Sequence, residues 1–120
     1  MRFATISDEM TVTPIRCHIK ERSLLALIAA RKLKKPRAAV TLGKTIHLWN
    51  TDKQTFLSDK SWLQHELCHV NQFHHYGYFS FLFRYFIENI RHGYLNNKFE
   101  TEARSAETGD FPGKILYEFS

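Results

Sequence analysis

The chain has 120 residues, of which 43% are hydrophobic, so its composition predicts one domain with a core and excludes an intrinsically disordered chain. Lys and Arg number 17 against 12 Asp and Glu, and the resulting net charge of +5 permits contact with nucleic acid or an anionic membrane without requiring it. Cys17 and Cys68 are too few for a disulfide framework, no apolar run is long enough for a transmembrane segment, and the first residues carry no secretory signal, so we expect a cytoplasmic protein.

The N-terminal part of the chain predicts a strand and then a helix. Apolar residues alternate with polar ones over residues 15–19, as in a strand, and Pro14 would place that strand at the edge of a sheet. Residues 21–35 are rich in Leu, Ala and Lys, which is typical of a helix, and Pro36 ends it.

A β-hairpin is expected next. Two short β-rich runs, AAVTL and TIHLW, are joined by Gly43 and Lys44, and a two-residue connection that contains glycine is typical of a hairpin turn. The polar residues 50–54 then predict a loop.

The rest of the chain is mainly helical by its pattern. Helices are expected over 58–77, over about 78–92 up to Gly93, and over 96–107, with a short strand at 115–117. With the first helix this gives an α+β fold of about four helices packed on a small antiparallel sheet.

The sequence HELCH in the second helix predicts a metal site. His65 and His69 are four residues apart, so they lie one turn apart on the same face of a helix and can bind one Zn²⁺ together. Glu66 lies beside the first histidine, where it does not bind the metal but can act as a general base on a metal-bound water. A polar helix face with two solvated histidines is the structural alternative.

A catalytic zinc needs a third protein ligand, and several residues compete for that role. His75 has the spacing of a metzincin ligand, but Gln72 stands where that pattern needs glycine, and a continuous helix would turn His75 away from His69. Glu100 and Glu102, in the sequence ETEA of the last helix, can supply a carboxylate, and His92 is a further candidate.

The two sequences together resemble a family of zinc enzymes. HELCH followed by ETEA looks like the gluzincin pattern, HExxH and then ExxA or ExxAD, in which the first Glu of ExxA is the third ligand. That position is Glu100 here, with Glu102 kept as the alternative. HELCHVNQF also resembles the HELxHVxQ signature of small bacterial zincin-like domains. The Asp that often follows Ala in the family is Arg104 here, which leaves open what makes the hydrogen bond of that Asp.

The resemblance implies a function. It implies a single zincin-like domain over 1–120, a zinc-dependent metallopeptidase with one Zn²⁺ per chain held by His65, His69 and Glu100, and Glu66 as the catalytic base. A peptide or protein would be the substrate, aligned along the edge strand TIHLW by backbone hydrogen bonds. Five side chains are candidates for stabilising the oxyanion: Tyr76, Tyr78, Tyr85, Tyr94 and His92.

Two other functions compete with the peptidase. The first is a non-catalytic domain that uses zinc for folding or for binding a partner, although a structural zinc has no need of Glu66. The second is a protein that binds an anionic surface through its excess of positive charge, with nucleic acid the less favoured partner.

Three further features have a simple structural interpretation. The basic run 31–37 is expected to be a solvated helix end rather than a phosphate or membrane contact. The seven aromatic residues between Tyr76 and Phe86 favour core packing of the helix 78–92, with any excess forming a homodimer surface, a partner surface, a substrate groove or a membrane contact. Cys68 is expected to be a small buried side chain rather than a fourth zinc ligand.

Overall fold

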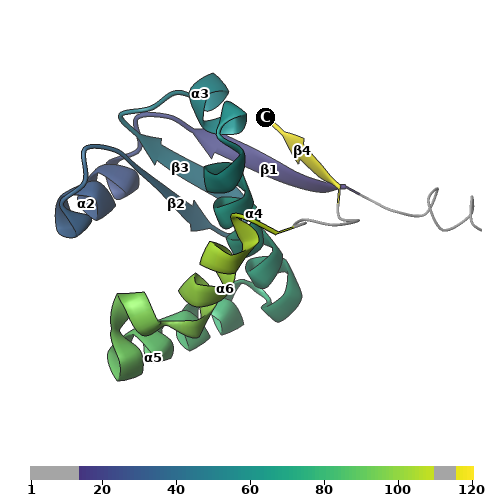
Figure 1. Ribbon diagram of the computed structural model, residues 1–120. Helices are drawn as coiled ribbons and strands as arrows, with labels where there is room; N and C mark the ends of the chain where they lie inside the picture. Colours follow the sequence, from purple (N-terminus) through teal and green to yellow (C-terminus); the bar gives the residue numbers. More distant parts are fainter. Residues whose placement is uncertain (1–13, 110–115) are drawn as a thin grey trace, which may run out of the picture.

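The computed structural model describes residues 14–109 and 116–120 and has an α+β fold, as expected from the sequence (Figure 1). Five helices lie in this part of the chain, one more than expected. The elements in chain order are β1 (Ile15–Lys20), α2 (Leu24–Leu33), β2 (Ala38–Leu42), β3 (Thr45–Trp49), α3 (Lys53–Ser58), α4 (Lys60–Tyr76), α5 (Tyr78–Asn96), α6 (Lys98–Ala106) and β4 (Tyr117–Phe119).

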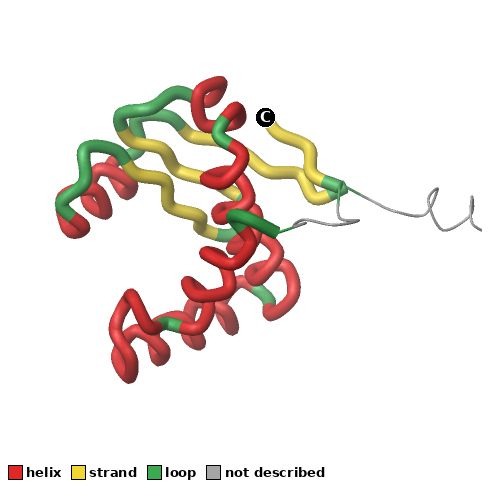
Figure 2. The backbone as a smooth tube through the Cα atoms, in the orientation of Figure 1, coloured by secondary structure: helices red, strands yellow, loops and turns green. Residues whose placement is uncertain are grey.

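The sheet is mixed, so the prediction of an antiparallel sheet was wrong. Its strand order is β2-β3-β1-β4, and only the hairpin of β2 and β3 is antiparallel (Figure 2). β1 pairs in parallel with both β3 and β4. Parallel neighbours need long crossover connections, and which distant segments pair in this way is not encoded in the local pattern that revealed the hairpin.

Two predictions about sheet edges were also wrong. β1 lies inside the sheet. Pro14, which has no backbone N–H, precedes the first residue of the strand and so removes no hydrogen bond from it. The pairing begins at Ile15, whose N–H donates to the carbonyl of Leu116 at 2.9 Å. TIHLW, which is β3, lies between β2 and β1. The edge strand that adjoins the helices is therefore β2.

The main core lies between the sheet and α4. The buried alternate residues of β1 and β3 meet the apolar face of α4, and Phe56 of α3, which has 0% of its surface exposed, fills the end of this layer. α3 begins at the N-cap Asp52, whose side chain accepts a hydrogen bond from the N–H of Thr55. The expected loop 50–54 thus includes the start of this six-residue helix, which is too short to show a helical period.

α4, α5 and α6 lie close to their predicted positions, although α5 continues past the predicted end to Asn96. α4 ends at Gly77, where φ is +88°, and the helical geometry of α5 is interrupted at Gly93, where φ is +77°. α6 lies against α4, and α5 lies beside both (Figure 1). Of the expected strand at 115–117, residue 115 lies outside the described residues, and β4 occupies Tyr117–Phe119.

The expected burial of the aromatic helix was wrong for most of its residues. Within α5 only Phe81 is buried, whereas five large apolar side chains are 61–81% exposed: Phe79, Phe83, Phe86, Ile90 and Leu95. None of the helices in the described residues has the length and apolar character that crossing a bilayer requires.

Candidate metal centre

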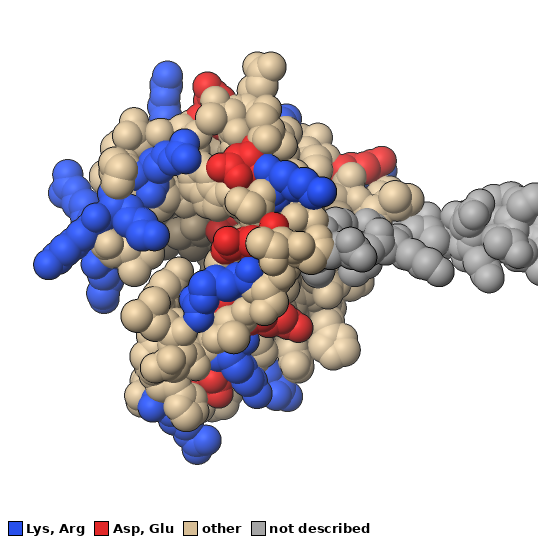
Figure 3. Space-filling model, viewed as in Figure 1, with Lys and Arg blue, Asp and Glu red and all other residues tan. Residues whose placement is uncertain are grey.

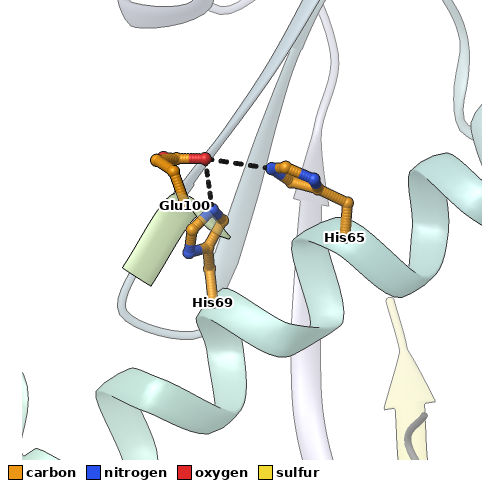
Figure 4. Close-up of side chains that lie close together, drawn as sticks. All are labelled: His65, His69 and Glu100. Carbon is orange, nitrogen blue, oxygen red and sulfur yellow. Dashed lines mark hydrogen bonds and ion pairs between the residues drawn. The ribbon is translucent and has the colours of Figure 1, made fainter. Parts of the chain in front are cut away.

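The two histidines of α4 meet one carboxylate of α6. His65 and His69 lie one turn apart, with their ring centroids separated by 5.0 Å. The Nε2 atoms of both rings face the same Oε1 atom of Glu100, at 3.2 Å and 3.3 Å (Figure 4). The structure therefore brings together the three residues that the sequence predicted as metal ligands.

Packing and capping of α6 position Glu100. Asn97 caps this helix by accepting a hydrogen bond from the N–H of Phe99 at 2.9 Å, and its amide donates to the carbonyl of Tyr85 and to Asn89 of α5. Phe99 and Ala103 are buried on the side of α6 that packs inward, and Glu100, which is 4% exposed, shares that side.

A second layer of hydrogen bonds orients the imidazole rings. Nδ1 of His65 lies 2.7 Å from a carboxylate oxygen of Glu107, and Nδ1 of His69 lies 2.8 Å from Oε1 of Gln72. Both partners are acceptors, so we assign the ring proton to Nδ1 in each histidine. The Gln72 amide donates to the carbonyl of Phe99 and to Glu102, which fixes its orientation. In each neutral ring the Nε2 lone pair is then free to bind a metal, whereas in the protonated ring the Nε2–H donates to Glu100.

This arrangement fits a bound zinc ion. The three ligand atoms lie within 4.8 Å of one another. Zinc–ligand bonds of about 2.0–2.2 Å place neighbouring ligand atoms roughly 3.3 Å apart in a tetrahedron, close to the two observed separations. Two neutral imidazoles and one carboxylate form a donor set of catalytic zinc sites, with one position left for water or substrate.

In the metal-free protein the cluster holds protons. Burial lowers the pKa of His69, but hydrogen bonding to Glu100 and its charge outweigh this and raise the pKa to about 9. Burial also lowers the pKa of His65, but the hydrogen bonds with Glu100 and Glu107 and the charge of Glu66 together outweigh burial and raise it. Burial raises the pKa of Glu100, yet the two histidines bring it well below its ordinary value. The centre therefore favours a cation, whether protons or a metal.

Glu66 is buried beside the cluster and held by the sheet. Its side chain is 4% exposed, and Oε1 accepts a hydrogen bond of 2.7 Å from the hydroxyl of Thr41 in β2. Burial raises the pKa of Glu66 above its ordinary value, against the opposing effect of the two histidines. A carboxylate in this environment can take up and release a proton closer to neutral pH.

A largely apolar cavity of about 390 Å³ opens onto the site. Residues of α2 and β2 line one side of it, residues of α4 and α5 line the other, and His65, Glu66, His69 and Glu100 contribute the polar groups. The chain thus supplies both walls of a cleft. Tyr85 and Tyr94 also line the cavity, and the Tyr85 hydroxyl donates a hydrogen bond to Oε2 of Glu100.

The other candidate ligands lie elsewhere. Glu102 accepts a hydrogen bond from Gln72 at 2.6 Å and is outside the cluster of three ligand atoms. α4 continues through Gln72, so His75 is exposed near the end of the helix, and His92 is exposed on α5. Cys68 is buried, as expected, and lies in a cluster with Ala103 and Ala106.

Sequence reasoning missed three residues of the site: Thr41, Gln72 and Glu107. Arg104, at the position of the Asp in the gluzincin pattern that the sequence resembles, donates from its guanidinium to the carbonyl of Leu95 and to Thr101. Glu107 makes the hydrogen bond to His65 instead. Its spacing of seven residues from Glu100, two helical turns on the same face, was the available signal.

Comparison of the chain with protein-family models, with curated proteins and with solved structures finds no significant match. The resemblance to gluzincins therefore stays a prediction. The functional argument rests on the geometry of the centre and its cleft.

Proposed function

We propose that the protein is a zinc-dependent metallopeptidase with one Zn²⁺ per chain. The observation that carries the proposal is the convergence of the His65 and His69 Nε2 atoms on a Glu100 oxygen, in the wall of a cleft that also holds the buried Glu66. A purely structural zinc site has neither an open cleft nor a use for a second carboxylate held at its edge.

Different residues of the chain have different roles in the proposed peptide hydrolysis. Zinc, when bound, lowers the pKa of a coordinated water towards about 7 and polarises a substrate carbonyl. Glu66 accepts the proton of the attacking water and passes it to the leaving amine. Thr41 keeps the Glu66 carboxylate oriented by its hydrogen bond, and Glu107 and Gln72 keep the two imidazoles oriented.

The substrate in this proposal is a peptide in extended conformation. β2 is an edge strand, and its residues Ala39–Leu42 line the cavity, so a peptide can add to this edge by backbone hydrogen bonds. Tyr94 is our choice for the group that stabilises the oxyanion. Burial and the nearby Glu100, with which its side chain also hydrogen-bonds, raise its pKa to about 12, so its hydroxyl stays protonated and can donate. Tyr94 is 38% exposed and so can turn toward a substrate.

We place this activity in the cytoplasm. Cys17 and Cys68 are both buried free thiols, and burial raises their pKa values to about 11 and about 12. Thiols that stay protonated and buried are suited to a reducing compartment.

Metal binding is the first test. Protein without a histidine tag should contain about one zinc per chain by elemental analysis, and His69→Ala or Glu100→Gln should abolish the binding. Matched controls are His74→Ala, an exposed histidine of the same helix, and Glu102→Gln on α6, both of which should retain the metal. Wild-type protein that binds no zinc, even after incubation with it, would overturn the proposal.

Cleavage is the second test, with a mixture of internally quenched peptides as the probe. Glu66→Gln should bind zinc normally but lose roughly 10²–10⁴-fold in cleavage rate, the usual contribution of a general base. If the zinc-loaded wild type cleaves no peptide, the non-catalytic zinc-binding domain becomes the better description.

A further inference from the structure

α2 buries its small residues and exposes its large ones. Ala26 and Ala30 face the sheet with at most 2% of their surface exposed, whereas Leu24 is 69% and Ile28 57% exposed. A helix that only covers a sheet would be turned the other way, with its large apolar side chains in the core. The outward face of α2 is therefore available to contact something outside the described chain.

α5 carries a second exposed apolar stripe. Phe79, Phe83, Phe86 and Ile90 recur at intervals of four, three and four residues, which places them along one side of the helix. Continuous apolar surface of this kind is typical of an interaction site rather than of a surface that faces water alone.

The two helices border the same cleft. Ala29, Lys32 and Leu33 of α2 line the cavity on one side, and Leu82 and Tyr94 of α5 line it on the other. Leu33 and Tyr94 also belong to the exposed apolar residues, at 39% and 38%. The two helices that carry the exposed apolar faces thus also line the cleft that leads to the metal centre.

Positive charge is concentrated at the same place. Residues 21–37 hold six basic side chains and one carboxylate, a net charge of +5 that equals the net charge of the whole chain. Figure 3 shows Lys and Arg gathered over the α2 end of the molecule. The six exposed basic residues are Arg22, Arg31, Lys32, Lys34, Lys35 and Arg37.

Acidic residues do not neutralise this charge within the described chain. Within the described residues, 14–109 and 116–120, Lys and Arg side chains form one ion pair, between Arg16 and Glu118. Several carboxylates are engaged with backbone N–H groups instead: Glu21 with Lys53, Asp52 with Thr55, Asp59 with Trp62 and Glu88 with Lys98.

We propose that the faces of α2 and α5 around the cleft dock on an anionic lipid surface. Exposed Leu, Ile and Phe side chains enter the interfacial region, and the basic residues of α2 meet lipid headgroups of opposite charge. A symmetric second copy fits less well, because it would bring two strongly basic α2 regions close together. The substrates would then be peptide segments at a membrane surface, an inference that rests on the proposed peptidase function.

Flotation with lipid vesicles tests the docking directly. The full chain should float with vesicles of phosphatidylcholine mixed with phosphatidylglycerol, and much less with phosphatidylcholine alone. Added salt should weaken the binding, because salt screens the attraction between surface charges. Equal binding to both kinds of vesicle, or binding to neither, would overturn the proposal.

Three sets of variants locate the contact. R31Q/K32Q/K35Q should lower the partition coefficient by roughly fivefold for each charge near the surface. L24Q/I28Q and F83Q/F86Q should each also lower it, because they remove the inserted apolar groups. The matched control K20Q/K44Q/K60Q changes three exposed lysines outside α2 and α5 and should bind as the wild type does. Loss of binding in this control alone would overturn the proposed location.

Two further measurements separate the alternatives. Light scattering should give a monomer at micromolar concentration; a dimer that F83Q/F86Q dissociates, with no vesicle binding, would show that a second copy covers the stripe. Glu66→Gln loaded with zinc should bind vesicles as the wild type does, whatever its peptidase activity. Failure of the peptidase test therefore leaves the docking result intact, and failure of the docking leaves the metal centre intact.

Discussion

α4 and α5 are neighbouring helices of 17 and 19 residues that differ in which of their side chains are buried. α4 is the more polar of the two, yet it buries eight residues, of which Gln64, Glu66, His69 and Gln72 are polar or charged. α5 is strongly apolar and aromatic, yet it buries only Phe81. The polar character of a helix therefore does not decide how deeply it is buried in this protein.

The difference between the helices lies in what surrounds them. α4 lies between the sheet and α6, where acceptors and donors such as Thr41, Glu100 and Glu107 satisfy its polar groups. Burial of a polar side chain costs little when its hydrogen bonds are made. No further layer of the described chain covers the outer side of α5, so its apolar residues stay outside. The five predictions that follow test this contrast, from the largest expected effect to the smallest.

The largest effect is expected within α5 itself. Phe81→Ala should lower the free energy of unfolding by about 3–5 kcal/mol, because the ring is 2% exposed and packs against Phe73 and Phe99. Phe83→Ala, two residues away and 67% exposed, should change it by less than about 0.5 kcal/mol. Urea denaturation measures both, and similar losses for the two variants would show that the stripe is covered in solution.

The polar cluster of α4 should make stability depend on pH in the metal-free protein. His69 has its pKa raised from 6.5 to about 9, so its contribution is complete below pH 6.5 and is lost as the pH rises towards 9. Glu100 has its pKa lowered, so its contribution is complete above its ordinary value of 4.5 and is lost in acid. In EDTA, the loss between pH 6.5 and 9 should be on the order of 1–3 kcal/mol.

Zinc should reverse this trend. Metal and protons compete for the two imidazoles, so the increase in melting temperature on adding zinc should grow from about pH 6 to about pH 8. Thermal unfolding with zinc and with EDTA across this range is the measurement. A zinc effect that is independent of pH would contradict histidine ligation.

The hydrogen bond that orients His65 should matter next. Glu107→Ala should weaken zinc affinity by about 10–100-fold, the usual effect of removing the partner of a metal-binding histidine. Glu107→Gln keeps an acceptor 2.7 Å from Nδ1 if the side chain stays in place and should recover much of the affinity. Competition with a zinc-binding dye measures both variants. Unchanged affinity in Glu107→Ala would mean that the ring is held by packing alone.

The smallest effect on stability is expected at the kink of α5. Gly93 has φ of +77° and ψ of 170°, a conformation that side chains strongly disfavour, and a Cβ there would meet no atom within 4 Å. Gly93→Ala should therefore cost about 1–2 kcal/mol from backbone strain alone. It should also reduce peptide cleavage, because Tyr94 follows the kink into the cavity. Gly109→Ala, whose Cβ would make an ordinary contact, is the control and should leave both unchanged.

Local patterns predicted the centre of this site well. The spacing of His65 and His69 was sufficient to pair them, because a regular helix fixes which residues share a face. Glu100 came from the resemblance of ETEA to the gluzincin pattern, which left Glu102 as an alternative. Gly77 marked the end of α4 and Gly93 the kink inside α5, and both have positive φ values. These features depend on near neighbours in the chain.

Features that depend on packing between distant elements were not predictable in this way. The partners of the imidazole Nδ1 atoms, Glu107 and Gln72, follow from how α6 lies on α4. The parallel pairing of β4 with β1 joins residues about a hundred positions apart. Apolar content predicted burial for Phe83 and Phe86, but whether a layer covers a helix is a property of the fold and not of the helix.

The contact between His69 and Glu100 also makes the chain between them a closed loop. These residues are 31 positions apart, and all of α5 lies in the span. A metal ion bound to both residues would act as a cross-link of the chain. A cross-link that closes a loop of this length lowers the conformational entropy of the unfolded chain and so stabilises the folded state by about 3–4 kcal/mol. Because α5 buries so few of its own residues, a cross-link between α4 and α6, the helices on either side of it in the chain, would contribute much of its stability. A zinc ion bound as we propose would therefore hold α4 and α6 together as well as take part in the reaction.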